Sequence, residues 1–260
     1  MTAFIETMTD GPVATVSLNR PDVHNAFNDS MIDQLDNTFY QLGQDPATRV
    51  IVLRSEGQSF CAGADLHWMS SMLDYTFDEN VEDAKRLFAM LRTINTCPKP
   101  IIGRVHGAAF GGGVGLISVC DMVVAVERAS FCLSEVKLGL LPAVISPFVM
   151  RSTTDSAARR YFLTAERFKA PEALELGLIH AVVQDEPALD AQVQAWVDLL
   201  VANAPVALRE CKQLIADVDG LDFDSALYLT TRRIAERRVS EEGQEGMQAF
   251  LGKRTPAWMK

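Results

Sequence analysis

The sequence has few cysteines, and their spacing is not typical of disulfides or metal sites. The count of five is odd and includes no Cys-x-x-Cys pair. We therefore expect reduced thiols, mostly buried, in a cytosol-like compartment. The four histidines show no metal-ligand spacing with one another or with cysteine, so we expect no metal site.

Targeting and membrane-spanning segments are also missing from the pattern. Residues 1–10 have no basic region followed by an apolar stretch, so no signal peptide is expected. The longest apolar run is interrupted by Arg104, His106 and Asp121 and is rich in glycine, which makes it a poor membrane span. We expect a cytoplasmic protein with no membrane partner.

Positive charge is in short supply. The chain has 24 basic and 34 acidic residues, a net charge of -10. Nucleic acid is therefore disfavoured as a partner, because its phosphates repel an acidic surface. A small phosphorylated ligand remains compatible with this charge, since a few amides or lysines can hold one phosphate.

What is present is apolar patterning for a large core. In 260 residues, of which 48% are hydrophobic, strand and helix patterns alternate until about residue 187 and predict an α/β fold. The expected strands are 4–8, 13–19, 50–53, 101–105, 122–126 and 130–133, with helical spacing over 31–42, 78–97 and 113–120. From Pro187 onward only helices are expected, at 187–202, 205–217, 223–238 and 240–251. We divide the chain into an α/β core, 1–195, and a helical C-terminal segment, 196–260.

Two loops of small residues stand out. AFGGGVG, residues 109–115, lies between a predicted strand and helix, where free backbone amides favour a phosphate or a developing oxyanion. A tight crossover that needs glycine only for packing explains the same pattern. SFCAGADL, residues 59–66, is a second such loop. One amide from each loop could hold a single oxygen, as in an oxyanion hole.

Several motifs in order carry a family resemblance: LNRPDVHNAF (18–27), SFCAGADL (59–66), KPIIGRVHGAAFGGGVGL (99–116), CDMVVAV (120–126) and FCLSEVKLGLLP (131–142). With them the chain resembles the crotonase (enoyl-CoA hydratase/isomerase) superfamily over essentially its whole length. The resemblance implies a crotonase-like spiral of β-β-α units with a C-terminal helical trimerisation segment. It also implies a homotrimer or homohexamer, acyl-CoA thioester substrates and no cofactor beyond the coenzyme A that the substrate carries.

The resemblance also implies site residues. The amides of Ala64 and Gly112 would hold the thioester oxygen, and the thioester and pantetheine arm would be what approaches the glycines. Contacts with coenzyme A or the acyl group are expected near Val23, His24, Ala26, Ala62, Asp65 and Leu66. Asp65 would equally cap the helix that starts at Leu66, which we favour. His106, Asp121, Cys61 and Cys132 are expected to be structural.

The sequence departs from the family at one catalytic position. Typical hydratases of the family carry two glutamates, whereas this chain has Gly115 at the first position and Glu135 at the second. A single carboxylate can act as base and then as acid. Hydration of a 2-enoyl-CoA, double-bond isomerisation and decarboxylation all fit that requirement. The alternative for Glu135 is a solvated carboxylate that pairs with Lys137.

Further departures suggest a subgroup. Ala143, in LLPAVISPFVMR (140–151), replaces a glycine that normally helps to hold water, and RRYFLTAERF (159–168) follows. Together these segments look most similar to bacterial methylglutaconyl-CoA and isohexenylglutaconyl-CoA hydratases. Their branched, carboxylated substrates predict a cation in the pocket, for which Lys137, His67 and Arg86 are candidates. We further expect that Gly115 makes room for a bulky or charged acyl group.

Our prediction is therefore an enoyl-CoA hydratase with Glu135 as its catalytic residue. The nearest alternative is an enoyl-CoA isomerase, which needs only one glutamate. A non-catalytic acyl-CoA-binding or RNA-associated relative is the alternative from another class, and the net charge of -10 disfavours the RNA version.

Overall fold

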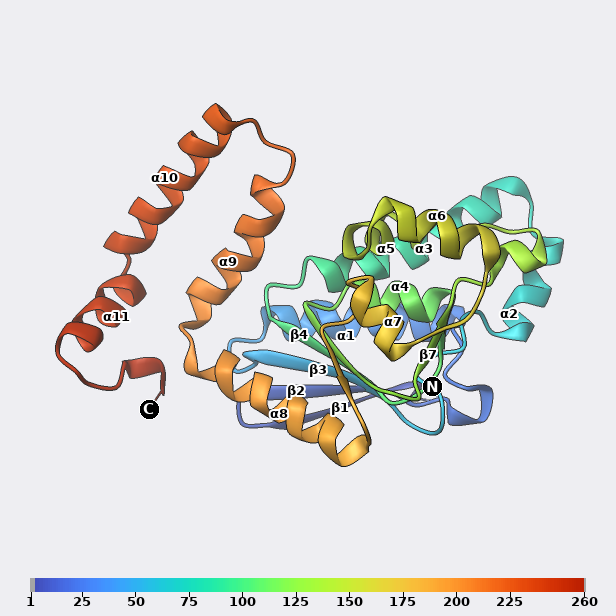
Figure 1. Ribbon diagram of the computed structural model, residues 1–260, viewed down its shortest axis with the longest axis horizontal. Helices are drawn as coiled ribbons and strands as arrows, with labels where there is room; N and C mark the ends of the chain where they lie inside the picture. The colour runs from blue at the N-terminus through green and yellow to red at the C-terminus, as the bar shows by residue number, and fades with distance from the viewer. Residues whose placement is uncertain (1–2, 260) are drawn as a thin grey trace.

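The computed structural model describes residues 3–259, and within them the chain forms two sheets and a set of helices (Figure 1). The strands are β1 (Ile5–Asp10), β2 (Val13–Leu18), β3 (Val50–Ser55), β4 (Ile101–Val105), β5 (Ala109–Phe110), β6 (Met122–Val126), β7 (Ser130–Cys132), β8 (Phe168–Lys169) and β9 (Ala181–Val183). The α-helices are α1 (Asp29–Gln44), α2 (Leu66–Ser71), α3 (Phe77–Asn95), α4 (Gly112–Ser118), α5 (Ser146–Ser152), α6 (Asp155–Thr164), α7 (Ala170–Glu175), α8 (Glu186–Ala202), α9 (Pro205–Val218), α10 (Phe223–Val239) and α11 (Glu241–Leu251). Short 3-10 helices are η1 (Pro21–Val23), η2 (Met72–Asp74), η3 (Glu135–Leu138) and η4 (Ala257–Met259).

The larger sheet has the strand order β1-β2-β3-β4-β6-β9. β1 and β2 form an antiparallel hairpin in which Asp10 pairs with Val13, so Gly11 and Pro12 make the turn, and Gly11 takes a φ of +53° that few other residues adopt. The remaining pairs are parallel. Their strands are apolar on both faces, as buried parallel strands require. The expected α/β fold is confirmed.

Helices cover both faces of this sheet. α8 packs against β3, β4, β6 and β9, whereas α1, α3 and α4 lie on the other side of the strands (Figure 1). α1 turns Met31, Leu35 and Phe39 inward at helical spacing. Its first turn is capped by the Asn28 side chain, which accepts from the Met31 amide. Amphipathic spacing and a cap together explain why the helix forms here.

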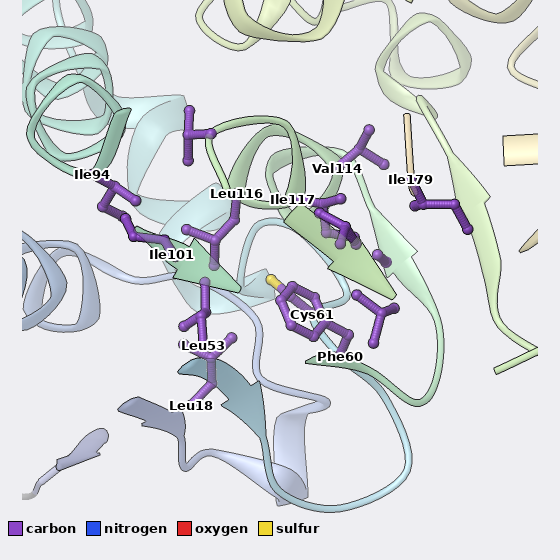
Figure 2. Close-up of a cluster of buried hydrophobic side chains, with 14 of the residues drawn as sticks. Leu18, Leu53, Phe60, Cys61, Ile94, Ile101, Val114, Leu116, Ile117 and Ile179 are labelled. Atoms are coloured by element: carbon purple, nitrogen blue, oxygen red, sulfur yellow. The ribbon is translucent and has the colours of Figure 1, made fainter. Parts of the chain in front are cut away.

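The main core lies between the large sheet and α4. Figure 2 shows Leu18, Leu53 and Ile101, from neighbouring strands, close to Leu116 of α4 and Ile94 of α3. All five side chains are fully buried. This packing holds α4, and therefore the glycines that precede it, against the sheet.

A second, small sheet was not expected from the sequence. β5, β7 and β8 pair in that order, β5 with β7 in parallel and β7 with β8 antiparallel. No strand was expected between the strand at 101–105 and the helix at 113–120, because strands of two residues carry too little pattern to detect. Phe131 stacks on Phe168 at a ring-centroid distance of 5.6 Å and anchors this sheet on the core.

After Asn203 the chain leaves the body and forms a helical arm of α9, α10 and α11, which projects to one side (Figure 1). No residue of α9 or α10 is buried. The expected boundary at residue 195 falls inside α8, which is one continuous helix and buries Val193 and Val197 against the body. The change of architecture therefore lies after Asn203.

The two ends of the arm are tied to the body at one place. The Arg49 guanidinium donates to the carbonyl oxygens of Asn203 (2.5 Å) and Trp258 (3.0 Å). The Trp258 indole donates to the Ala202 carbonyl at 3.1 Å. Farther along α9, Lys212 pairs with Asp121 at 2.7 Å. Among residues 3–259, no helix combines the length and apolarity needed to cross a membrane.

Candidate active site

The two loops of small residues meet as the sequence predicts. The Cys61 amide donates to the Ala108 carbonyl at 3.0 Å, and the Phe110 amide donates to the Cys61 carbonyl at 2.9 Å. Gly63 has a φ of +94°, and a Cβ atom there would lie 3.1 Å from the Phe110 carbonyl oxygen. The loop after β3 and the loop before α4 are thus joined backbone to backbone, without room for a side chain at Gly63.

The glycine triplet is required by the protein's own packing. A Cβ on Gly113 would lie 2.5 Å from the Cys61 carbonyl oxygen, and one on Gly112 would lie 2.9 Å from the Phe27 ring. The alternative that the crossover needs glycine for packing is therefore sufficient at these two positions, and the approach of a ligand to them stays a prediction. Neighbouring protein atoms already come that close.

Two backbone amides at this junction are left without acceptors. Phe27 bonds to the Gly63 carbonyl and the Asp65 amide, on either side of Ala64, so the Ala64 N–H points to the opposite edge of the strand. Gly112 is the first residue of α4, where the N–H has no partner inside the helix. Neither N–H donates a hydrogen bond within the described residues. Both are therefore available to an oxygen.

Glu135 lies at the same junction. It opens η3 directly after β7, and its Oε1 atom lies 3.1 Å from the position that a Cβ on Gly111 would occupy. Its Oε2 atom is buried and has no hydrogen-bond partner among residues 3–259. Burial raises the pKa of this carboxyl above its ordinary value, and no charged neighbour contributes to the shift. The Glu135 side chain is thus half-buried, and one of its carboxyl oxygens, Oε2, is buried and unpaired.

The alternative reading of Glu135 as a surface ion-pair partner is wrong. Lys137 is exposed, and no ion pair joins it to Glu135. A buried carboxyl without a partner is costly for folding. Such a group is typical of a functional site rather than of a solvated turn.

The position of the missing second glutamate is filled by the core. A Cβ on Gly115 would lie 2.4 Å from Ile145 Cγ2 and 2.9 Å from Ile145 Cβ. Ile145 is 3% exposed. The expectation that Gly115 makes room for an acyl group is therefore wrong, because an isoleucine side chain occupies that space.

The expected ligand-contact residues divide into two groups. Val23, His24 and Leu66 are exposed around the junction, where the Ala62 amide donates to the His24 carbonyl at 3.0 Å. Ala62 is half-buried, and Ala143 is exposed after the LGLLP segment. Ala26 and Asp65 are buried and face the protein. Asp65 caps α2 by accepting from the His67 amide at 2.8 Å, which confirms the expected helix cap.

The candidate cations differ in availability. Arg86 is engaged at 2.7 Å by Asp33 of α1. His67 and Lys137 are exposed on α2 and η3, the two segments that follow Ala64 and contain Glu135. Unlike Arg86, neither side chain forms an ion pair within residues 3–259.

The residues expected to be structural are so placed. His106 bonds through Nε2 to the Gly57 carbonyl at 2.8 Å, and Asp121 accepts from the Ile101 amide and from Lys212. Burial raises the pKa of the Cys61 thiol to about 12, which keeps it protonated. No group of three or more histidine, cysteine or carboxylate side chains within residues 3–259 is arranged to hold a metal ion.

Three residues near the junction were not singled out from the sequence: Arg20, Phe27 and Ile145. Arg20 and Phe27 both lie in the LNRPDVHNAF motif. The signal for Arg20 was a lone basic residue directly after a buried strand. Ile145 had no local signal, because it meets Gly115 only through the fold.

Comparison with known proteins places the chain among characterised folds. The family described as enoyl-CoA hydratase/isomerase matches residues 8–260. The crystal structure of an enoyl-CoA hydratase from Shewanella pealeana is 45% identical, with a TM-score of 0.95, over 98% of this chain and 96% of its own. The enoyl-CoA hydratase ACTT6 of Alternaria alternata is 35% identical over 97% of this chain and 83% of its own. The 2,3-dehydroadipyl-CoA hydratase of Escherichia coli is 32% identical over 94% of both chains.

Proposed function

Because the chain belongs to the enoyl-CoA hydratase/isomerase family, we propose that it adds water to the double bond of a 2-enoyl-CoA thioester with Glu135 as its single catalytic carboxylate. The Ala64 and Gly112 amides hold the thioester oxygen. The reaction needs no cofactor beyond the coenzyme A of the substrate.

The proposed chemistry balances with one carboxylate. Glu135 takes a proton from water while the water oxygen bonds to C3 of the substrate. The electrons of the C2–C3 double bond move onto the thioester oxygen, which the two amides stabilise by about 3–4 kcal/mol each in such sites. Glu135 then returns the same proton to C2. The net change is one hydroxyl on C3 and one hydrogen on C2.

One observation carries this proposal: the Glu135 carboxyl, with its unpaired Oε2 atom, lies against Gly111. At the same junction the N–H groups of Ala64 and Gly112 have no acceptor within the described residues. A raised pKa suits a group that must both accept and release a proton near neutral pH. The names of the relatives support hydration as the reaction.

For the substrate we propose a branched or carboxylated enoyl-CoA of the methylglutaconyl-CoA type. Support comes from the E. coli relative, whose named substrate also carries a distal carboxylate. In the chain itself, His67 and Lys137 are exposed basic side chains close in sequence to Ala64 and Glu135. Either one could pair with that carboxylate.

The test is a hydration assay with crotonyl-CoA and 3-methylglutaconyl-CoA in parallel. Loss of the conjugated enoyl absorbance reports hydration, and product formed in D₂O should carry one deuterium at C2. Faster turnover of the branched diacid supports the substrate proposal, while hydration of crotonyl-CoA alone refutes it. No hydration of either, together with inactivity on longer enoyl chains, rejects the hydratase.

One observation favours a second candidate, an enoyl-CoA isomerase. Ile145 fills the place of a second carboxylate, and moving a proton between C2 and C4 needs only one. A 3-enoyl-CoA would then become the conjugated 2-enoyl-CoA, with absorbance gained and no water added. The two activities are separated by which substrate reacts and by the mass of the product.

We also propose that the protein assembles as a homotrimer or as a pair of trimers. The arm supports this, because it exposes large apolar side chains such as Phe223 (95% exposed) and Phe250 (84%). Sedimentation equilibrium at several concentrations measures the assembly, and a monomer at micromolar concentration contradicts it.

A further inference from the structure

Arg20 occupies an unusual place beside the Ala64 segment. It lies between β2 and η1, and its guanidinium group reaches two elements of the junction. One nitrogen donates to the Ala26 carbonyl at 2.5 Å, and another donates to Asp65 Oδ2 at 2.7 Å. The Arg20 and Asp65 side chains are 13% and 5% exposed, so the pair is almost wholly desolvated.

The ion pair closes a ring of hydrogen bonds around Ala64. The Phe27 amide donates to the Gly63 carbonyl at 2.7 Å, and the Asp65 amide donates to the Phe27 carbonyl at 2.8 Å. Arg20 joins the same two segments a third time, from Ala26 to the Asp65 side chain. Ala64 is therefore the central residue of a segment that is held on both sides.

The second oxygen of Asp65 fixes the direction of the chain after Ala64. Oδ1 accepts from the His67 amide and so starts α2, while Oδ2 accepts from Arg20. Burial by itself opposes ionisation, but the hydrogen bonds from Arg20 and His67 keep the pKa of Asp65 below its ordinary value. The carboxylate thus stays charged and paired with Arg20 in neutral solution.

We propose that Arg20 is a positioning residue for the reaction: through Asp65 it sets the direction of the Ala64 N–H toward the thioester oxygen. This role rests on the proposed function, because it assigns that amide to the oxygen. Arg20 itself does not touch the substrate. Its effect is geometric, and a donor that points away from the developing charge loses much of its value.

The experiment compares kcat, KM and ligand polarisation in Arg20→Gln, Arg20→Lys and wild type. Removing a whole oxyanion donor typically costs about 10²–10³ in kcat. For a misdirected donor we expect a loss of about 10- to 100-fold in kcat, with KM within about threefold. Arg20→Lys keeps the charge but loses the forked guanidinium that reaches both acceptors. Its kcat should therefore lie between those of wild type and Arg20→Gln.

A direct readout is the absorbance of a conjugated aromatic enoyl-CoA bound to the protein. Hydrogen bonds to its carbonyl shift the absorbance to longer wavelength, and Arg20→Gln should reduce that shift. This measurement is made in a Glu135→Gln background, so that no turnover occurs. It therefore tests the oxyanion contact even if the reaction is isomerisation.

Two comparisons distinguish positioning from general stability. Asp65→Asn keeps an acceptor for the His67 amide. If Arg20 acts through Asp65, the double variant Arg20→Gln/Asp65→Asn should lower kcat no more than the more damaging of the two single variants. Arg104→Gln is the matched control: its guanidinium, 10% exposed, pairs with Asp190 of α8 at 2.6 Å. It should lower the melting temperature and leave kcat unchanged.

The outcomes separate the two proposals. Wild-type kcat and an unreduced absorbance shift in folded Arg20→Gln overturn the positioning role while the hydratase stands. An equal loss of kcat in Arg104→Gln also overturns it, since losing the ion pair of another buried arginine would then lower kcat just as much. Wild-type protein that turns over no enoyl-CoA, yet shows the arginine-dependent shift, rejects the reaction and keeps the positioning.

Discussion

The loop junction and the helical arm both contain groups that lack a partner within the protein. At the junction these groups are polar, and on the arm they are apolar. At the junction, polar groups lack hydrogen-bond partners within the protein: the buried Oε2 atom of Glu135 and the N–H groups of exposed Ala64 and half-buried Gly112. On the arm, apolar side chains such as Phe223 and Phe250 are exposed without cover. The unpartnered polar groups suit a small ligand that offers an oxygen and a transferable proton. The exposed apolar side chains suit contact with another protein surface.

The difference shows where substitutions should act. Changes at the junction should alter chemistry and spare the fold, unless they enter the packed space around Gly115. Changes in the arm should alter local stability and spare the chemistry of the protomer.

Glu135→Gln should have the largest effect. In the proposed mechanism Glu135 is the one carboxylate that transfers the proton, and such transfer contributes about 10²–10⁴ in rate, so we expect at least about a 10³-fold fall in kcat. The fold should not suffer, because a neutral amide replaces an unpaired, desolvated carboxyl. Steady-state kinetics and thermal unfolding on one preparation check both statements. A severe loss of stability would assign Glu135 to the fold instead.

The same residue predicts two pH dependences. Activity of the wild type should fall on acidification through a pKa above the usual glutamate value, because the ionised form is the base. Stability runs the other way: with its folded-state pKa raised, Glu135 favours folding below its unfolded pKa, and this contribution is lost as the pH rises through the folded one. Glu135→Gln should therefore become more stable than wild type as the pH rises through the folded-state pKa of Glu135, and not at lower pH.

Gly115→Glu should have the next largest effect, on the fold rather than on the chemistry. The new Cβ would meet Ile145 at 2.4 Å, and the carboxylate would be buried. We expect a loss of about 3 kcal/mol or more from overpacking and desolvation together. Urea unfolding measures it.

Ile145→Ala in the same chain is the control for that variant. The double variant should recover part of the stability, because the clash is relieved. A Gly115→Glu protein as stable as wild type would show that the space beside Gly115 opens in solution. It would also revive the idea that a second carboxylate fits there.

Glu242→Ala should have the smallest effect, confined to the arm. α9 lacks a capping side chain at Ala204, and Glu242 of α11 accepts instead from the Val206 and Ala207 amides, both at 2.9 Å. Loss of this cap should cost about 1–2 kcal/mol. Hydrogen exchange should quicken in α9 and stay unchanged in β3, with Glu241→Ala as the exposed control. Faster exchange throughout the sheet would contradict the separation of arm and body.

Much of the fold could be predicted from the sequence because its signals are local. The helix at 205–218 begins at a proline, and the helix at 223–239 begins directly after the capping residue Asp222. Apolar residues at helical spacing then indicate how far each helix extends. The hairpin at Gly11 and the strand at 101–105 were equally visible. The paired strands of two residues at 109–110 and 168–169 were not, since their pairing joins segments far apart in the chain.

The site shows the same limit. Ala64, Gly112 and Glu135 were named from motifs, and the structure brings their segments together. The contact of Ile145 with Gly115 and the reach of Arg20 to Asp65 could not be found that way. Both depend on which side chains fill a given space, and that is decided by the whole fold rather than by the spacing of residues.

The clamp formed by Arg49 has a mechanical consequence. The arm departs at Asn203 and returns at Trp258, both held by one guanidinium, and two ion pairs, Lys212–Asp121 and Asp219–Arg151, tie it to the body a second time. A force on the arm would therefore have to break these two ion pairs before the three helices could turn together about Arg49, as in hinge motions of domains. Asp121 also accepts from the Ile101 amide, so the Lys212 pair would pass part of that force to β4, the strand before the glycine loop.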